Sequence, residues 1–396
     1  MIISELKKIW RSRVLWVFLA ALIVLNILQI NTLSRKAKGN SKEFNSAREQ
    51  IYSQVCGEFK IENLEFVIDT YEAAAQAVNS GSYSTEPNQE GTYTGYIFGD
   101  YSLFGEFYDE MNYMYNYAES MNSTIEKAKE NIAFFTEKNN EYSARQNQQI
   151  VNLYENRCID AYYKTQGAYS LICYDFSSVF VLLLCVLCIS PIFTREHETQ
   201  MYSLLKTTKM GNTKLGIAKI SATLISAFTV ALAFYLVDFF SFFVFFDIDC
   251  MSNPIYSISN FKNTPFSCSI GQYLLIVLMY RLIGIMVMSL IYLLCSLIAP
   301  DEILSFCISI GITVLLIFSG GSFNPVMMLT IRDLHRRYNV CNLFGVPVPQ
   351  HVVLLVAMIL LSLTLSAIIL ALSRRRKTRH RTLKELLADG KERLFS

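Results

Sequence analysis

The sequence is short of charged residues. Asp, Glu, Lys and Arg make up only 17% of its 396 residues, while 52% are hydrophobic and the mean hydropathy is +0.31. A soluble globular protein averages about 25% charged residues. The composition therefore excludes the ordinary soluble class and indicates an integral membrane protein.

Motifs for catalysis are also missing. Residues 211–218 read GNTKLGIA, with two glycines at phosphate-loop spacing but without the Lys and Ser or Thr that must follow the second. Residues 195–200 lack the HExxH arrangement, only four histidines are present, and the cysteines show no zinc-site spacing. We therefore expect this chain to have no catalytic residue, no metal site and no cofactor of its own.

Six apolar stretches are long enough, or nearly so, to cross a hydrocarbon core that needs about 20 helical residues. They cover residues 14–32, 169–193, 215–246, 270–299, 303–320 and 351–373. None shows the alternation of a barrel strand, so an all-α integral membrane protein with six transmembrane helices is predicted. The first stretch lacks a small-residue cleavage site, which favours a retained anchor over a secretory signal.

Basic residues next to the spans indicate the orientation, because they favour the cytoplasmic side. They precede the first span, recur in a connector at residues 194–214, and form a dense run in the tail at residues 374–396. Six spans place all three groups on one side. We predict a multi-pass cell-membrane protein with both termini in the cytoplasm, although Arg332, Arg336 and Arg337 then lie outside.

The amino terminus is amphipathic. Ile2, Leu6, Ile9 and Trp10 share one helical face, which predicts an interfacial helix over residues 1–13 that contacts membrane lipids. The alternative is a generic, positively flanked start to a membrane anchor.

A long polar region, residues 33–168, separates the first two spans and predicts an extracellular helical-hairpin domain. Apolar and aromatic residues recur at helical intervals between residues 113 and 135. This stripe is typical of a seam between two helices, and a ligand surface is the alternative. The tyrosine-rich residues 93–117 are compatible with either a hairpin tip or a partner surface.

Two pairs of cysteines are candidate disulfides if their side of the membrane is oxidising. Cys56 with Cys158 would close the base of the predicted extracellular domain, and Cys250 with Cys268 would close a second loop.

Ionisable residues within apolar spans are costly in lipid and are therefore candidates for function or pairing. Asp238 and Arg281 stand out, but their different depths disfavour a mutual pair. Asp175 lies close to the end of its span, where water would reach it.

The ELKKIW start, the six spans and the connector FTREHETQMYSLLKTTKMGNTKLGIAK together resemble a type-2 ABC transporter permease. In that family an elbow helix precedes the first span, and a coupling helix between spans two and three docks into a separate ATPase. The resemblance places Glu196 and Glu198 at the acidic position in alternative registers, followed by a coupling helix at residues 199–209. The candidate coupling residues also include Thr199, Tyr202, Leu205 and Lys209, and Lys219 occupies a following basic position.

The resemblance implies ATP and Mg in a partner ATPase, a second permease copy or a homologous permease, and no nucleic acid. It also implies that residues 321–350 form a re-entrant hairpin of two short helices, with spans three to five within residues 215–320. Export of a peptide, an antimicrobial or a lipid is the expected function. Two alternatives remain: a mechanotransmission complex that acts on an extracellular partner without transport, and a membrane receptor or scaffold.

Overall fold

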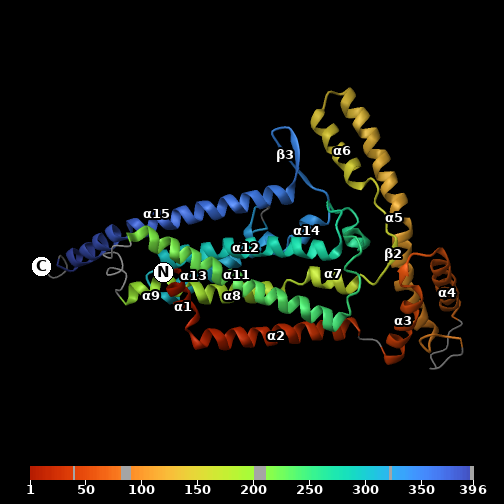
Figure 1. The fold of residues 1–396 in the computed structure, drawn as a ribbon, viewed down its shortest axis with the longest axis horizontal. Helices are drawn as coiled ribbons and strands as arrows, with labels where there is room; N and C mark the ends of the chain where they lie inside the picture. The colour runs from red at the N-terminus through yellow and green to blue at the C-terminus, as the bar shows by residue number, and fades with distance from the viewer. Residues whose placement is uncertain (39–40, 82–90, 200–210, 321–322, 393–396) are drawn as a thin grey trace.

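A helical bundle and a domain that projects from one end of it make up the computed structural model (Figure 1). The structure describes residues 1–38, 41–81, 91–199, 211–320 and 323–392. Within these residues, five helices are long and apolar enough to cross a membrane: Arg13–Ala37, Gln166–Glu196, Thr213–Phe246, Ile270–Ile298 and Gln350–Arg374. A further apolar helix, Glu302–Phe318, has 17 residues. This mostly helical architecture fits a multi-pass membrane protein.

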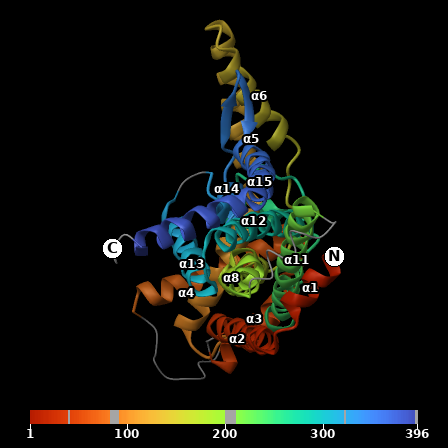
Figure 2. The ribbon, with the colours of Figure 1, turned by 90° about the vertical axis from the view of Figure 1, so that its left-hand side faces the viewer.

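The bundle is built around α8, which is apolar on all sides and is therefore buried. Viewed along the bundle, α8 lies in the middle with α2, α11, α12 and α13 around it (Figure 2). The bundle elements are α1 (Ile2–Trp10), α2 (Arg13–Ala37), α7 (Gln166–Cys173), α8 (Phe176–Ile189), α9 (Pro191–Glu198), α11 (Gly211–Phe246), α12 (Ile270–Ile298), α13 (Glu302–Phe318) and α15 (Gln350–Glu392). The amino terminus and the last described residues of α15 lie at the end of the bundle opposite the projecting domain (Figure 1).

The second predicted span is interrupted. In place of one continuous helix over residues 169–193, the chain forms α7, α8 and α9. Tyr174 adopts an extended backbone at the first break, and Pro191 begins α9 at the second. A break in a helix leaves backbone carbonyls without helical partners, so other groups must satisfy them.

The projecting domain has its own apolar cores. It contains α3 (Lys42–Val55), β1 (Gly57–Glu58), α4 (Ile61–Asn79), α5 (Ile97–Glu137), α6 (Glu141–Tyr154) and β2 (Ala161–Tyr162). At 41 residues, α5 is about 60 Å long, and α4 and α6 pack against its two halves. Tyr117, Met121 and Ile125 of the aromatic stripe are buried in a cluster with Val151 and Tyr154, so the stripe is a seam between α5 and α6.

Arg157 joins the projecting domain to the bundle. Its guanidinium donates to the carbonyls of Thr264 (3.1 Å) and Phe266 (3.2 Å). It also lies 4.9 Å from the ring centroids of both Tyr154 and Tyr256. Residue 256 belongs to the link between α11 and α12, which contains η1 (Ile255–Ser257) and η2 (Ser259–Phe261). A buried guanidinium with these partners restricts how the two parts can move independently.

The segment before α15 differs from the expected pair of short helices. It forms η3 (Pro325–Met328), α14 (Arg332–His335) and then an antiparallel hairpin of β3 (Val340–Leu343) and β4 (Val346–Pro349). Phe344 and Gly345 both have positive φ, as a tight two-residue hairpin turn requires. The prolines at 347 and 349 also disfavour a helix in β4.

Gly284 allows η3 to approach α12 closely. A Cβ at this position would lie 2.7 Å from Met328 Cβ and 3.2 Å from the Pro325 carbonyl oxygen. We expect Gly284→Ala to lower the free energy of unfolding by about 1–3 kcal/mol through overpacking. Unfolding of the purified protein in mixed micelles would measure this change. Gly311→Ala is the matched control, because a Cβ there meets nothing within 4 Å. Equal stability of Gly284→Ala and wild type would contradict the expectation.

Candidate functional site

A cluster of four charged side chains, three of them buried and Lys8 exposed, lies at the end of the bundle opposite the projecting domain. It consists of Glu5 and Lys8 on α1, Glu196 on α9 and Lys219 on α11, and we call it the basal charge cluster. Three segments that are distant in the sequence therefore meet here through their charges.

Lys219 is the centre of the cluster, and its side chain is 0% exposed. Its Nζ lies 3.2 Å from Glu5 Oε2 and 2.9 Å from Glu196 Oε1, and it donates to the Ile192 carbonyl oxygen at 2.8 Å. The ammonium group thus donates hydrogen bonds to Glu5 and Ile192 and forms an ion pair with Glu196. The Phe193 ring centroid lies 5.0 Å away and helps to keep water out.

Lys8 completes the charge balance at the surface side of the cluster. Its Nζ lies 2.7 Å from Glu5 Oε1 and 2.9 Å from Glu196 Oε1. Burial by itself would raise the pKa of Glu5, but Lys219 and Lys8 outweigh it and hold that pKa below the usual value. Burial would likewise lower the pKa of Lys8, and the two carboxylates raise it above the usual value instead. Glu5 and Lys8 are therefore held in their charged forms.

The predicted coupling residues have different surroundings. Glu196 is in the basal charge cluster, whereas Glu198 is exposed and accepts a hydrogen bond from the Glu302 backbone N–H at the start of α13, at 3.0 Å. Thr199 is exposed, and its hydroxyl donates to the Arg195 carbonyl at 2.8 Å. Tyr202, Leu205 and Lys209 lie outside the described residues.

Sequence reasoning missed Glu5 and Lys8 as partners of the connector, because it treated residues 1–13 only as an interfacial helix. Their spacing of three residues was a usable signal, since it places them side by side on a helix. Only the packing of α1 against α11 shows that this face meets Lys219.

A second charged group lies at the break between α7 and α8. Asp175 pairs with Arg281 at 2.9 Å and also with Arg332. Arg281 donates to the free carbonyl of Ile172 and, through Nε, to that of Leu329, each at 3.1 Å. The break thus supplies both an acid and an acceptor for a buried guanidinium. The Asp175 side chain remains 28% exposed, and no pattern in the sequence indicated its two arginine partners.

Asp238 forms no ion pair with this group among the described residues. It is 3% exposed and accepts a hydrogen bond of 2.6 Å from Asn26, which in turn accepts one of 2.7 Å from the Tyr174 hydroxyl. Asp238 and Arg281 both line a cavity of about 450 Å³ between α11 and α12, whose walls are otherwise largely apolar. Such a cavity suits an apolar or amphipathic molecule.

The cysteines are free thiols in the structure, so neither predicted disulfide is present. The local pairing explains why. The Ile255 N–H donates to the Cys268 carbonyl and the Gly271 N–H to that of Met251, which offsets Cys250 from Cys268 along the two segments. In the β1–β2 pair, Gly57 lies opposite Tyr162, which similarly offsets Cys56 from Cys158. Among the described residues, no group of three or more His, Cys, Asp or Glu side chains is arranged to hold a metal ion.

Comparisons with known proteins add no family assignment to this geometry. No family model matches the chain, and searches of curated proteins and of solved structures find no match.

Proposed function

We propose that this chain is the permease subunit of an ABC transporter and that a separate ATPase subunit drives it. The observation that carries the proposal is the basal charge cluster. Glu196 precedes residues 200–210 and Lys219 follows them, and the two side chains are joined at 2.9 Å. Force applied to the intervening connector would act on α9 and α11 together, and on α1 through Glu5.

The proposed topology has six spans, with α13 counted among them. Local thinning of the bilayer and snorkelling of flanking residues allow a helix of 17 residues to span. Both chain ends and the basal charge cluster would face the cytoplasm, where the basic residues of the connector and the tail also belong. The projecting domain would then be extracellular.

The remaining parts of the transporter would come from other chains. The ATPase would supply ATP and Mg chemistry, and a second permease copy or a homologous permease would complete the pathway. Export of a peptide, an antimicrobial or a lipid is the proposed activity. The apolar cavity beside Asp238 supports an amphipathic cargo, because it combines largely apolar walls with two charged side chains.

A photo-crosslinking experiment tests the proposal. We expect benzoylphenylalanine at position 202 to form an adduct with a chain that contains a phosphate-loop ATPase, when the full protein is expressed in its native cells. Mass spectrometry would identify the adduct. The same group at position 344, a fully exposed site on the hairpin at the other end of the molecule, should form no ATPase adduct. Absence of the adduct from position 202 in correctly inserted protein would refute the proposal.

A mechanotransmission complex is the second candidate, and Arg157 is the observation that favours it. This residue holds the projecting domain to the link between α11 and α12, so movement of α11 would reach α5 and α6. In this case ATP hydrolysis would proceed without movement of any solute across the membrane. A flux measurement in proteoliposomes with the partner ATPase separates the two candidates.

A further inference from the structure

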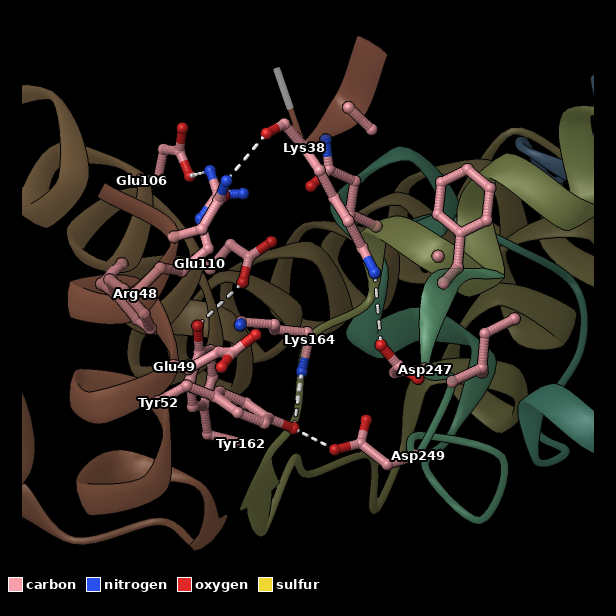
Figure 3. A pocket seen from close by; sticks show the side chains of 17 residues that line it. Lys38, Arg48, Glu49, Tyr52, Glu106, Glu110, Tyr162, Lys164, Asp247 and Asp249 are labelled. Atoms are coloured by element: carbon pink, nitrogen blue, oxygen red, sulfur yellow. Dashed lines mark hydrogen bonds and ion pairs between the residues drawn. The ribbon is translucent and has the colours of Figure 1, made fainter. Parts of the chain in front are cut away.

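A cavity of about 410 Å³ lies between the projecting domain and the bundle (Figure 3). One wall comes from α3 and α5 of the projecting domain. The other comes from the end of α2, the start of α7, the end of α11 and residues 247–249. This volume falls within the range of about 300–1,000 Å³ that is typical of small-molecule sites.

Much of the charge around the cavity is already paired. Lys38 lies 3.3 Å from Asp247, and Arg48 pairs with Glu106. The Tyr52 hydroxyl donates to Asp249. These pairs hold the walls of the cavity together. The charged side chains that remain incompletely paired are others.

Lys164 points into the space between the walls, toward Glu49 and Glu110 (Figure 3). Among the described residues its ammonium forms no ion pair, and it lies over the Tyr52 ring, whose centroid is 4.2 Å from Nζ. Burial lowers the pKa of Lys164, as does the nearby Arg48, although Glu110 and Glu49 act in the opposite direction. The ammonium has lost water without gaining a direct partner of opposite charge.

The acidic side of the cavity is incompletely paired as well. Glu110 accepts one hydrogen bond of 2.9 Å from the Tyr162 hydroxyl, and Glu49 forms no ion pair within the described part of the chain. Burial raises the pKa of Glu110, which means that its charged form is poorly stabilised. A molecule that carried a positive and a negative group would satisfy both sides of the cavity.

We propose that this cavity binds a small zwitterion, with its ammonium group at Glu49 and Glu110 and its acidic group at Lys164. A simple anion would meet the carboxylates and a simple cation would meet Lys164 and Arg48, so a ligand of one charge is disfavoured. Phe246 and Ile248 supply an apolar surface for the body of the ligand.

Two sources share this chemistry. One is a free amino acid or short peptide, and the other is the ethanolamine phosphate headgroup of a lipid. The second is relevant because Ala37 and Phe246, which end α2 and α11, both line the cavity. Either ligand would touch the projecting domain and the bundle at once and would stabilise their relative position. This binding property belongs to the chain itself and does not depend on the proposed ATPase.

Calorimetric titration of the full chain in phosphatidylglycerol nanodiscs tests the soluble source. The probe is alanyl-leucine with free ends, compared with its N-acetyl and C-amide analogues. We expect binding of the free dipeptide only, weakened tenfold or more by Lys164→Gln and by Glu110→Gln. Lys42→Gln, an exposed site on α3 outside the cavity, should leave binding unchanged. Thermal unfolding of each variant would show that it is folded.

Native mass spectrometry tests the lipid source. From mixed phosphatidylethanolamine and phosphatidylglycerol, wild type should retain the ethanolamine lipid, and Lys164→Gln should lose that preference. Binding of either the dipeptide or the ethanolamine lipid with this mutational pattern supports the proposal and identifies the source. It is overturned if wild type binds neither probe, or if folded Lys164→Gln and Glu110→Gln bind as wild type does.

Discussion

Lys219→Met is expected to lower the free energy of unfolding by about 3–5 kcal/mol, because removal of one partner from a buried ion-pair cluster leaves uncompensated charge. Lys219 is fully buried, and its loss leaves Glu5 and Glu196 with Lys8 alone. The Met side chain fills much of the same volume, so the effect reports mainly on charge. Reversible unfolding of the purified chain in mixed micelles would measure it.

Two variants make this measurement specific. Lys214→Met lies on the same helix at an exposed position, and we expect it to change stability by less than about 0.5 kcal/mol. Glu5→Gln combined with Lys219→Met removes one charge of each sign and should recover part of the loss, since contacting residues are energetically coupled. If Lys219→Met were as stable as Lys214→Met, the cluster would have no stabilising role.

Asp175→Ala is expected to cost about 2–4 kcal/mol, somewhat below the value for a fully buried pair because the Asp175 side chain is 28% exposed. The change leaves Arg281, whose side chain is 8% exposed, without its carboxylate and near the like charge of Arg332. Unfolding in mixed micelles is again the measurement.

A double variant that also removes the charge of Arg281 tests the expected effect of Asp175→Ala. Asp175→Ala combined with Arg281→Met should be more stable than Asp175→Ala alone, because the buried guanidinium is then absent. Asp69→Asn, an exposed site in the projecting domain, serves as the control and should remain close to wild type. A double variant less stable than Asp175→Ala would mean that the hydrogen bonds of Arg281 to Ile172 and Leu329 matter more than its charge.

The apolar stretches predicted the bundle well, because a run of about 20 apolar residues has few ways to avoid water other than as a membrane helix. Their boundaries agree closely at α11 and α12. The interruption at Tyr174 and Asp175 could not be read from hydropathy, since the residues on both sides remain apolar. Arg281 and Arg332 make the break favourable, and they are more than 100 residues away in the sequence.

The candidate site was also predicted only in part from the sequence. The resemblance singled out Glu196 and Glu198 without choosing between them, and it placed Lys219 nearby in the pattern. The structure distinguishes the two acids by their environment: Glu196 is buried against Lys219, and Glu198 is exposed at the start of α13. The rotation of α9 about its own axis determines which of the two acids faces α11. That rotation depends on how the neighbouring helices pack.

The sequence by itself determined that the chain is a helical membrane protein, because its low charge and long apolar runs leave no soluble alternative. Its lack of a phosphate loop also led to the expectation that energy for transport comes from another chain. Only the tertiary structure decided which charges meet: Lys219 with Glu5 and Glu196, and Arg281 with Asp175. The physical reason is that a buried charge requires a partner, and packing alone determines which distant partner lies within about 3 Å.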